Sequence, residues 1–363
     1  MELLATWARK LAAWWDGLGE AAQGWPWLGD VADALGQVLP LSALLAYAGL
    51  GVLSAAARAR GIARRRASYG KGARQIAHLA LLLGWGLLIG GRVWLWLRQG
   101  GATGFALPEM AWLTLGGAVL ASSLDFALWS AHARWPALHV ASGVVSGLLG
   151  LVACAAVLAL VRFAASAPLG SAMPPLGALF HPAASPGYAL ALAMLPFLIL
   201  SLAGAMGGCW LVLRRRHDDF GRDHYNIMLP WCVSWARNAW IAFWPLLAAA
   251  AGWRLWGAHG GAGLPPAAAV REGVLLAFWL SPLAFWWLVA RSPAPLRHKP
   301  GLLAALLLAM TATLPWNAHF APPPPTAGKA AMLPAAPLGA AAAMTAARPC
   351  ARPPACGPSA RRG

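Results

Sequence analysis

The chain has 363 residues, of which 60% are hydrophobic and only 11% are charged, and its mean hydropathy is +0.59. Soluble domains have roughly 45–50% apolar and about 25% charged residues. The composition therefore excludes an ordinary soluble domain, a disordered protein, a coiled coil and a disulfide-rich scaffold. We predict an all-α fold, a polytopic integral membrane helical bundle that contacts the lipid bilayer.

The formal net charge of the chain is +17. In a soluble protein this excess of Lys and Arg would indicate nucleic-acid binding. Here the basic residues fall in short links between apolar runs, which is the distribution that sets the orientation of membrane proteins. We therefore expect no nucleic-acid partner.

Residues 1–36 form the first expected segment. Apolar residues recur there at steps of three or four, at Leu3, Trp7, Leu11, Trp14 and Leu18. This spacing places them on one face of a helix, with charged residues between them. We predict an outward-facing amphipathic helix that lies on the membrane surface or packs over the ends of the bundle.

Residues 37–320 form the expected transmembrane domain. A helix that crosses a bilayer needs about 20 mainly apolar residues. Eight runs meet this description, at 37–57, 76–98, 109–131, 138–163, 188–213, 226–250, 272–290 and 300–319. The sequence therefore predicts about eight transmembrane helices.

The links between these runs differ in charge. Fifteen Lys and Arg residues lie in the links after the first, third, fifth and seventh runs, whereas the intervening links hold only Arg254 and Arg271. Basic links stay in the cytoplasm. We predict a multi-pass protein of a bacterial inner membrane, with both termini outward.

Four of the charged residues that lie within or at the ends of the expected spans are candidate site residues, because charge is costly there. Arg92 and Glu109 are expected to pair across a short outward loop, as a structural ion pair or as a substrate or quinone contact. Asp125 and Arg237 are expected to form a buried ion pair. A proton path or a polar ligand site would use the same residue types.

Five of the nine histidines lie at the ends of the spans that face the basic links. They are His78, His132, His139, His217 and His224. A b-type haem needs two axial ligands, usually imidazoles at one depth on different helices. His78 and His139 are the best-placed pair and His132 is an alternative to either. The other interpretations are polar interfacial residues, a transition-metal site or a proton relay. His217 and His224 flank an acidic loop and are expected to be solvated.

Small residues and prolines mark the expected helix contacts and kinks. Three GxxxG pairs are expected to let helices approach closely, Gly86 with Gly90, Gly143 with Gly147, and Gly204 with Gly208. Prolines at positions 196, 230, 245, 282 and 315 are expected to kink or loosen helices.

Residues 321–363 are rich in Pro and Ala and are expected to be disordered, because they cannot bury a core. The chain has no P-loop, GxGxxG or HExxH motif. The His cluster, Asp125 and Arg237 favour a membrane subunit of an electron-transfer complex that handles quinone, b haem or both, with other redox subunits as partners. The alternatives are a small-solute transporter and a non-catalytic scaffold or assembly factor.

Overall fold

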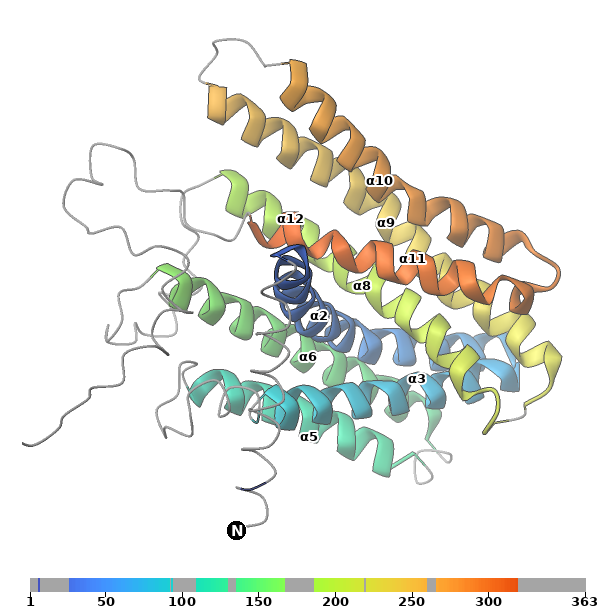
Figure 1. Cartoon of the computed structure of the whole chain (residues 1–363). Coiled ribbons are helices and arrows are strands. Elements are labelled where there is room, and N and C mark those ends of the chain that lie inside the picture. Colours follow the sequence, from blue (N-terminus) through green and yellow to red (C-terminus); the bar gives the residue numbers. More distant parts are fainter. Residues whose placement is uncertain are drawn as a thin grey trace, which may run out of the picture. The chain divides into compact units, whose positions relative to one another are not determined.

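The computed structural model contains only helices in the residues that it describes, so the predicted all-α fold class is confirmed (Figure 1). It describes residues 6, 26–91, 93, 109–129, 135–166, 186–218, 220–259 and 266–318. The elements are α2 (Pro26–Arg64), α3 (Ala67–Trp85), the π-helical turn η1 (Gly86–Gly90), α5 (Glu109–Ala127), α6 (Pro136–Ser166), α8 (Pro186–Arg214), α9 (Arg222–His259), α10 (Pro266–Arg291), the 3₁₀ turn η3 (Pro295–His298), α11 (Lys299–Thr311) and α12 (Thr313–Ala318).

Five of the described helices are long and apolar enough to cross a bilayer. Their apolar parts are Val38–Arg64, Ala67–Gly90, Pro136–Leu158, Ala189–Arg214 and Pro266–Arg291. A helix satisfies all its backbone hydrogen bonds internally, which is what an apolar segment requires in lipid. Five such helices have the length and composition of a multi-pass membrane protein.

The predicted count of eight spans is not confirmed. The apolar part of α5, Trp112–Ala127, is shorter than the five spans. Helix α9 has 38 residues but carries Arg237 and Asn238 in its middle, which lowers its hydropathy. Helix α11 has 13 residues and is separated from α12 at Ala312, so it reaches only about 20 Å. The sequence shows an apolar run at each place but not where each helix ends.

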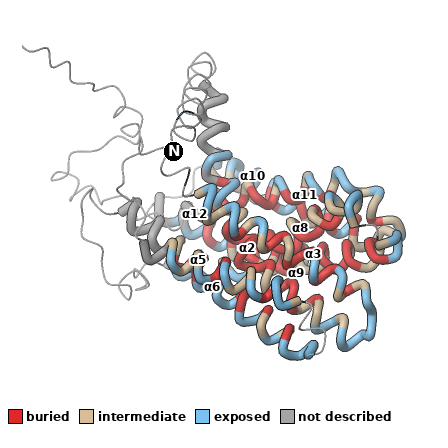
Figure 2. The backbone as a smooth tube through the Cα atoms, turned by 90° about the horizontal axis from the view of Figure 1, so that it is seen from below, coloured by how far each residue is buried: buried red, intermediate tan, exposed pale blue. Residues whose placement is uncertain are grey.

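The described helices pack around α2, which contacts α3, α6 and α8. Helix α5 packs against α6 and α3, whereas α9 packs against α8 and α10, and α10 against α11. Buried residues concentrate in α2, α8 and α9 (Figure 2). The two helices α5 and α9 therefore belong to different parts of the bundle, which decides the pairing of their charged residues.

Apolar side chains are exposed on the outer helices. Val145, Leu148 and Val152 form an exposed stripe on α6, and Val270 and Val274 begin another on α10. Their spacing of three or four residues places each set on one helical face. Large apolar side chains on an outer face are expected for helices that contact lipid tails.

Glycines allow close helix contacts at two of the three expected GxxxG pairs. A Cβ at Gly147 of α6 would lie 2.8 Å from the backbone nitrogen of Val52 in α2. A Cβ at Gly204 of α8 would lie 2.7 Å from both the Ala236 nitrogen and the Cys232 oxygen in α9. No side chain fits at these positions without moving a backbone.

The third pair does not form such a contact. A Cβ at Gly86 or Gly90 would meet nothing within 4 Å. Both glycines lie in η1, where the helix changes from α to π geometry. The prediction of a helix contact at this pair is therefore wrong for the described part of the chain.

The expected N-terminal amphipathic helix and the Pro- and Ala-rich tail from 321 to 363 lie almost entirely outside the described residues. The exceptions are Thr6 and the start of α2, a helix that begins at Pro26 and continues without interruption through Pro40 to Arg64. The first expected span is thus the central and last part of a helix of 39 residues.

Candidate functional site

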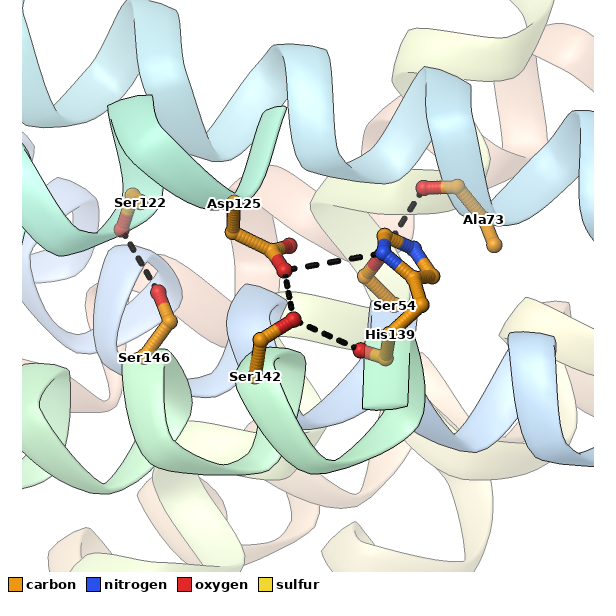
Figure 3. Close-up of polar contacts among 7 residues, drawn as sticks. All are labelled: Ser54, Ala73, Ser122, Asp125, His139, Ser142 and Ser146. Atoms are coloured by element: carbon orange, nitrogen blue, oxygen red, sulfur yellow. Dashed lines mark hydrogen bonds and ion pairs between the residues drawn. The ribbon is translucent and has the colours of Figure 1, made fainter. Parts of the chain in front are cut away.

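A buried cluster of polar side chains lies between the end of α5 and the start of α6 (Figure 3). Asp125 Oδ1 lies 3.7 Å from His139 Nδ1 and accepts a hydrogen bond from Ser142 Oγ. The side chains of Asp125 and His139 are only 9% and 3% exposed. We call Asp125, His139 and Ser142 the acid–base cluster.

Helical spacing in the sequence brings these residues together. Asp125 lies two residues before the end of α5, and His139 lies in the first turn of α6, which begins at Pro136. His139 and Ser142 are three residues apart and therefore share one helical face. Helices α5 and α6 pack against each other, which brings that face to Asp125.

Hydroxyl groups extend the cluster one helical turn deeper. Ser122 lies one turn before Asp125 on α5, and its Oγ is 3.0 Å from Ser146 Oγ of α6. The hydroxyl of Tyr47 on α2 is 3.2 Å from the same Ser122 oxygen. We call Tyr47, Ser122 and Ser146 the hydroxyl chain. It links three helices with groups that both donate and accept hydrogen bonds.

Sequence reasoning missed the hydroxyl chain and Ser142. The available signal was the pairing of two short patterns, Ser122 with Asp125 and His139 with Ser142 and Ser146, each at helical spacing. Each serine alone is unremarkable in an apolar helix, where its hydroxyl often bonds a carbonyl of the preceding turn. Ser122 does so as well, donating to the Ala118 oxygen at 3.0 Å.

An aromatic ring and a guanidinium group lie beside the His139 imidazole of the acid–base cluster. The Trp129 ring meets the His139 imidazole edge-on, with centroids 4.1 Å apart. The guanidinium carbon of Arg58 lies 5.7 Å from the centre of the Trp129 ring. A cation therefore lies one ring away from the imidazole, and the cluster sits at the end of the bundle where α2 ends and α6 begins.

The predicted ion pair between Asp125 and Arg237 is wrong. Arg237 Nε and Nη2 donate to Oδ1 of the adjacent Asn238, at 3.1 and 2.9 Å. Asp125 instead contacts His139 and Ser142 of α6. The physical reason is the packing of the helices, since α5 packs on α3 and α6 whereas α9 packs on α8 and α10. Similar depth in the membrane does not make two residues neighbours.

Three other predicted site residues cannot be placed. Arg92 and His132 lie outside the described residues, and the structure describes the backbone of Glu109 but not its side chain. The pairing of Arg92 with Glu109, and the use of His132 as a haem ligand, therefore stay predictions.

His78 lines a pocket of about 400 Å³ at the end of the bundle, which we call the end pocket. Its lining residues are Lys71, Arg74, Gln75, His78, Phe126, Arg214, Asp218 and Phe220. The imidazole stacks on Phe126 of α5 and packs against Trp210 of α8, at centroid distances of 5.6 and 5.8 Å. The end pocket thus brings together α3, α5, α8 and the loop that follows α8.

The positions of His78 and His139 do not fit a b-type haem held between them. Two axial imidazoles must direct a nitrogen at one shared iron. His78 lines the end pocket and His139 does not. The Nδ1 of His139 faces Asp125, and its ring packs on Trp129. Each imidazole therefore has separate surroundings.

A second polar network joins α3 and α9 beside the end pocket. Gln75 Nε2 donates to Asp218 Oδ2 at 3.1 Å, and Gln75 Oε1 lies 3.1 Å from His224 Nε2. Arg214 Nε also donates to Asp218 Oδ2, at 2.9 Å. His224 is 2% exposed. The expectation that His224 is solvated is therefore wrong, because the link folds back onto Gln75.

The network shifts the pKa values of its ionisable groups, which precede the expected span of α9. Burial, aided by the nearby cation of Lys71, lowers the pKa of His224 to about 4. Burial raises the pKa of the Asp218 carboxyl, but hydrogen bonds from Gln75 and Arg214 outweigh it and hold the pKa below its usual range. His224 is therefore neutral and Asp218 ionised at neutral pH.

This network predicts that the protein loses stability in mild acid. An unfolded imidazole binds a proton near pH 6.5. Folded His224 does not bind one until about pH 4. The contribution of His224 to the free energy of unfolding is constant above pH 6.5 and falls between pH 6.5 and 4, while Asp218 stays ionised. The melting temperature in detergent should decrease across this interval, by about 1–2 °C for each kcal/mol lost in a chain of this length.

The matched variants for this prediction are His224→Gln and His217→Gln. Glutamine at 224 removes the titrating group and keeps an amide near Gln75, so the melting temperature should depend less on pH. His217 is exposed, and its replacement should leave the pH dependence unchanged. Equal pH profiles for the wild type and His224→Gln would contradict the prediction.

Comparisons with known proteins add no relationship to this geometry. The chain matches no protein-family model, no curated protein and no solved structure.

Proposed function

We propose that the chain is a multi-pass membrane protein that binds and releases a proton at Asp125 and His139 as part of a proton-coupled transport cycle. The observation that carries the proposal is a carboxylate and an imidazole 3.7 Å apart and almost completely buried among apolar helices. Ionisable groups in such surroundings are costly and are usually kept for function.

The chemistry of the two groups supports proton exchange. Because an imidazole and a carboxylate at this distance interact electrostatically, a proton bound by either group changes the charge that the other group faces. Histidine changes charge near neutral pH more readily than any other side chain. The Ser142 hydroxyl donates to the same carboxylate oxygen. The hydroxyl chain of Tyr47, Ser122 and Ser146 supplies further proton donors and acceptors toward α2.

Prolines inside three of the continuous helices support transport as the function of this proton exchange. Pro196 lies inside α8, Pro230 and Pro245 inside α9, and Pro282 inside α10. Each proline removes a backbone hydrogen bond, which loosens a helix at a defined point. Transporters bind solutes beside interrupted helices and move those helices during the cycle.

A quinone-linked electron-transfer subunit is the second candidate. The observation that favours it is His78, which no hydrogen bond or ion pair engages within the described residues and which stacks on Phe126 in the end pocket. An imidazole N–H beside an aromatic ring suits a quinone head group, and quinone reduction consumes protons. A haem held between His78 and His139 lacks support, since these two residues have separate surroundings, whereas a haem that uses His132 stays a prediction.

Infrared difference spectroscopy between neutral and acidic buffer tests the proton site. An imidazole band should change as His139 binds its proton, and a carboxylate band should shift with it, because the proton changes the charge that Asp125 faces. Both changes should disappear together in Asp125→Asn. The control is Asp223→Asn, which alters an exposed carboxylate and should leave the imidazole change intact. An unaltered spectrum for Asp125→Asn would contradict the proposal.

Reconstituted vesicles separate the candidate functions. If the chain is a transporter, an imposed solute gradient should change the internal pH, and Asp125→Asn should abolish the change. If it is a quinone-linked subunit, a quinone analogue should bind and shift the imidazole band. A scaffold would give neither response, and the wild type would then equal protein-free vesicles.

We also propose the orientation that the basic links predict, in a bacterial inner membrane. Reporter fusions after residues 66 and 215 should report a cytoplasmic position, and a fusion after residue 170 should report an outward one. A cytoplasmic signal at residue 170 would overturn this topology.

A further inference from the structure

The end pocket carries more positive than negative charge. Lys71 and Arg74 of α3 and Arg214 of α8 line it, with Asp218 as the single carboxylate among its lining residues. Asp218 is already bonded to Arg214 and to the Gln75 amide. The charges of Lys71 and Arg74 therefore have no carboxylate partner within the described part of the chain.

These two cations belong to one face of α3. Lys71, Arg74, Gln75 and His78 follow the spacing i, i+3, i+4 and i+7, and all four line the end pocket. Like charges at this spacing repel each other. An anion between Lys71 and Arg74 would remove that repulsion, and both side chains are exposed and able to reach one.

The other walls of the end pocket are aromatic. Phe126 stacks on His78, and the Lys71 ammonium lies 4.8 Å from the centre of the Phe220 ring. The volume of about 400 Å³ lies within the range of small-molecule sites, roughly 300–1,000 Å³. A bare inorganic anion would leave most of it empty. The ligand that fits has a charged group and an organic part.

We propose that the end pocket binds a phosphate ester, with its phosphate oxygens on Lys71 and Arg74 and its organic part against Phe126 and Phe220. Arginine is suited to phosphate because its planar guanidinium donates two parallel hydrogen bonds. Two sources supply this chemistry, a phospholipid head group and a soluble phosphate ester. The proposal is independent of proton exchange at Asp125 and His139.

Ligand binding to the purified full-length protein in neutral detergent tests the inference. The probes are dioctanoyl phosphatidic acid and phenyl phosphate, and binding is followed by tryptophan fluorescence and by the melting temperature. Lys71→Gln with Arg74→Gln should weaken binding by at least about tenfold, since hydrogen bonds to charged groups are lost. Arg74→Lys keeps the charge and should retain part of the affinity.

The matched control replaces two exposed cations away from the end pocket, Arg222→Gln with Lys299→Gln, and should bind like the wild type. Melting without ligand shows that each variant is folded. If both probes bind, the end pocket accepts soluble phosphate esters. If only phosphatidic acid binds, the ligand of the end pocket is a phospholipid head group. Both outcomes support the inference. The inference would be overturned if the Lys71 and Arg74 double variant bound the probes with the affinity of the wild type. It would also be overturned if a neutral quinone analogue bound and neither phosphate probe did.

Discussion

Replacing Gly204 by valine is expected to force α8 away from α9 and to lower the yield of folded protein sharply. Even a single Cβ at Gly204 would lie 2.7 Å from the Ala236 nitrogen and from the Cys232 oxygen. Both are backbone atoms, so no rotation of a side chain relieves the clash. Overpacking costs about 1–3 kcal/mol, and a clash with backbone belongs at or above the upper end.

The measurements are abundance in the membrane and melting temperature in detergent. Gly273→Val is the matched control, because a Cβ at Gly273 of α10 would meet nothing within 4 Å. It introduces the same β-branched residue into a described helix and should cost little. If both variants melt alike, the close contact of α8 with α9 does not hold the bundle together.

Helix existence could be predicted from the sequence because it depends on local apolar runs. Leu and Ala are abundant in every expected segment, and a helix satisfies the backbone hydrogen bonds of such a segment in lipid. The ends of the helices were harder to predict, because the helix propensity of the residues changes little at those positions. The start of α2 at Pro26, far before the expected residue 37, illustrates this. So does α11, which ends at Thr311 although the apolar run continues.

Helix pairing could not be predicted, and it decided the outcome for the candidate site. Asp125 and Arg237 have opposite charges and are expected at compatible depths, yet α5 packs mainly on α6 and α3 whereas α9 packs mainly on α8 and α10. His139 was recognised as a candidate ligand, but its acid partner was not. The partner follows from the hairpin of α5 and α6, which turns the Asp125 face toward the first turn of α6.

The end of the bundle shows a similar limit. The link after α8 looks solvated from its composition, because it is rich in Arg, His and Asp. In the structure Gln75 of α3 bonds both Asp218 and His224 and draws this link inward. A single amide in an apolar helix carries no sequence signal of that role. The network depends on a contact between residues 149 positions apart.

Replacing Asp125 by leucine is expected to destabilise the protein, whereas Asp125→Asn is expected to preserve most of its stability. Leucine removes the carboxylate that faces the buried His139 imidazole and the Ser142 hydroxyl. Loss of one partner in a buried polar contact costs about 1–3 kcal/mol. Asparagine keeps an oxygen that Ser142 can donate to. Melting temperatures in detergent measure both effects.

A double-mutant cycle then separates structural from proton-exchanging roles of the pair. His139→Leu should cost less in the Asp125→Leu background than in the wild type, with a coupling energy of about 0.5–3 kcal/mol. A purely structural pair would show this coupling and leave the infrared spectrum of the stable Asp125→Asn variant unchanged. The proton site predicts the coupling together with loss of the paired carboxyl and imidazole bands. Absence of any coupling would show that Asp125 and His139 do not act as a unit, and would contradict both roles.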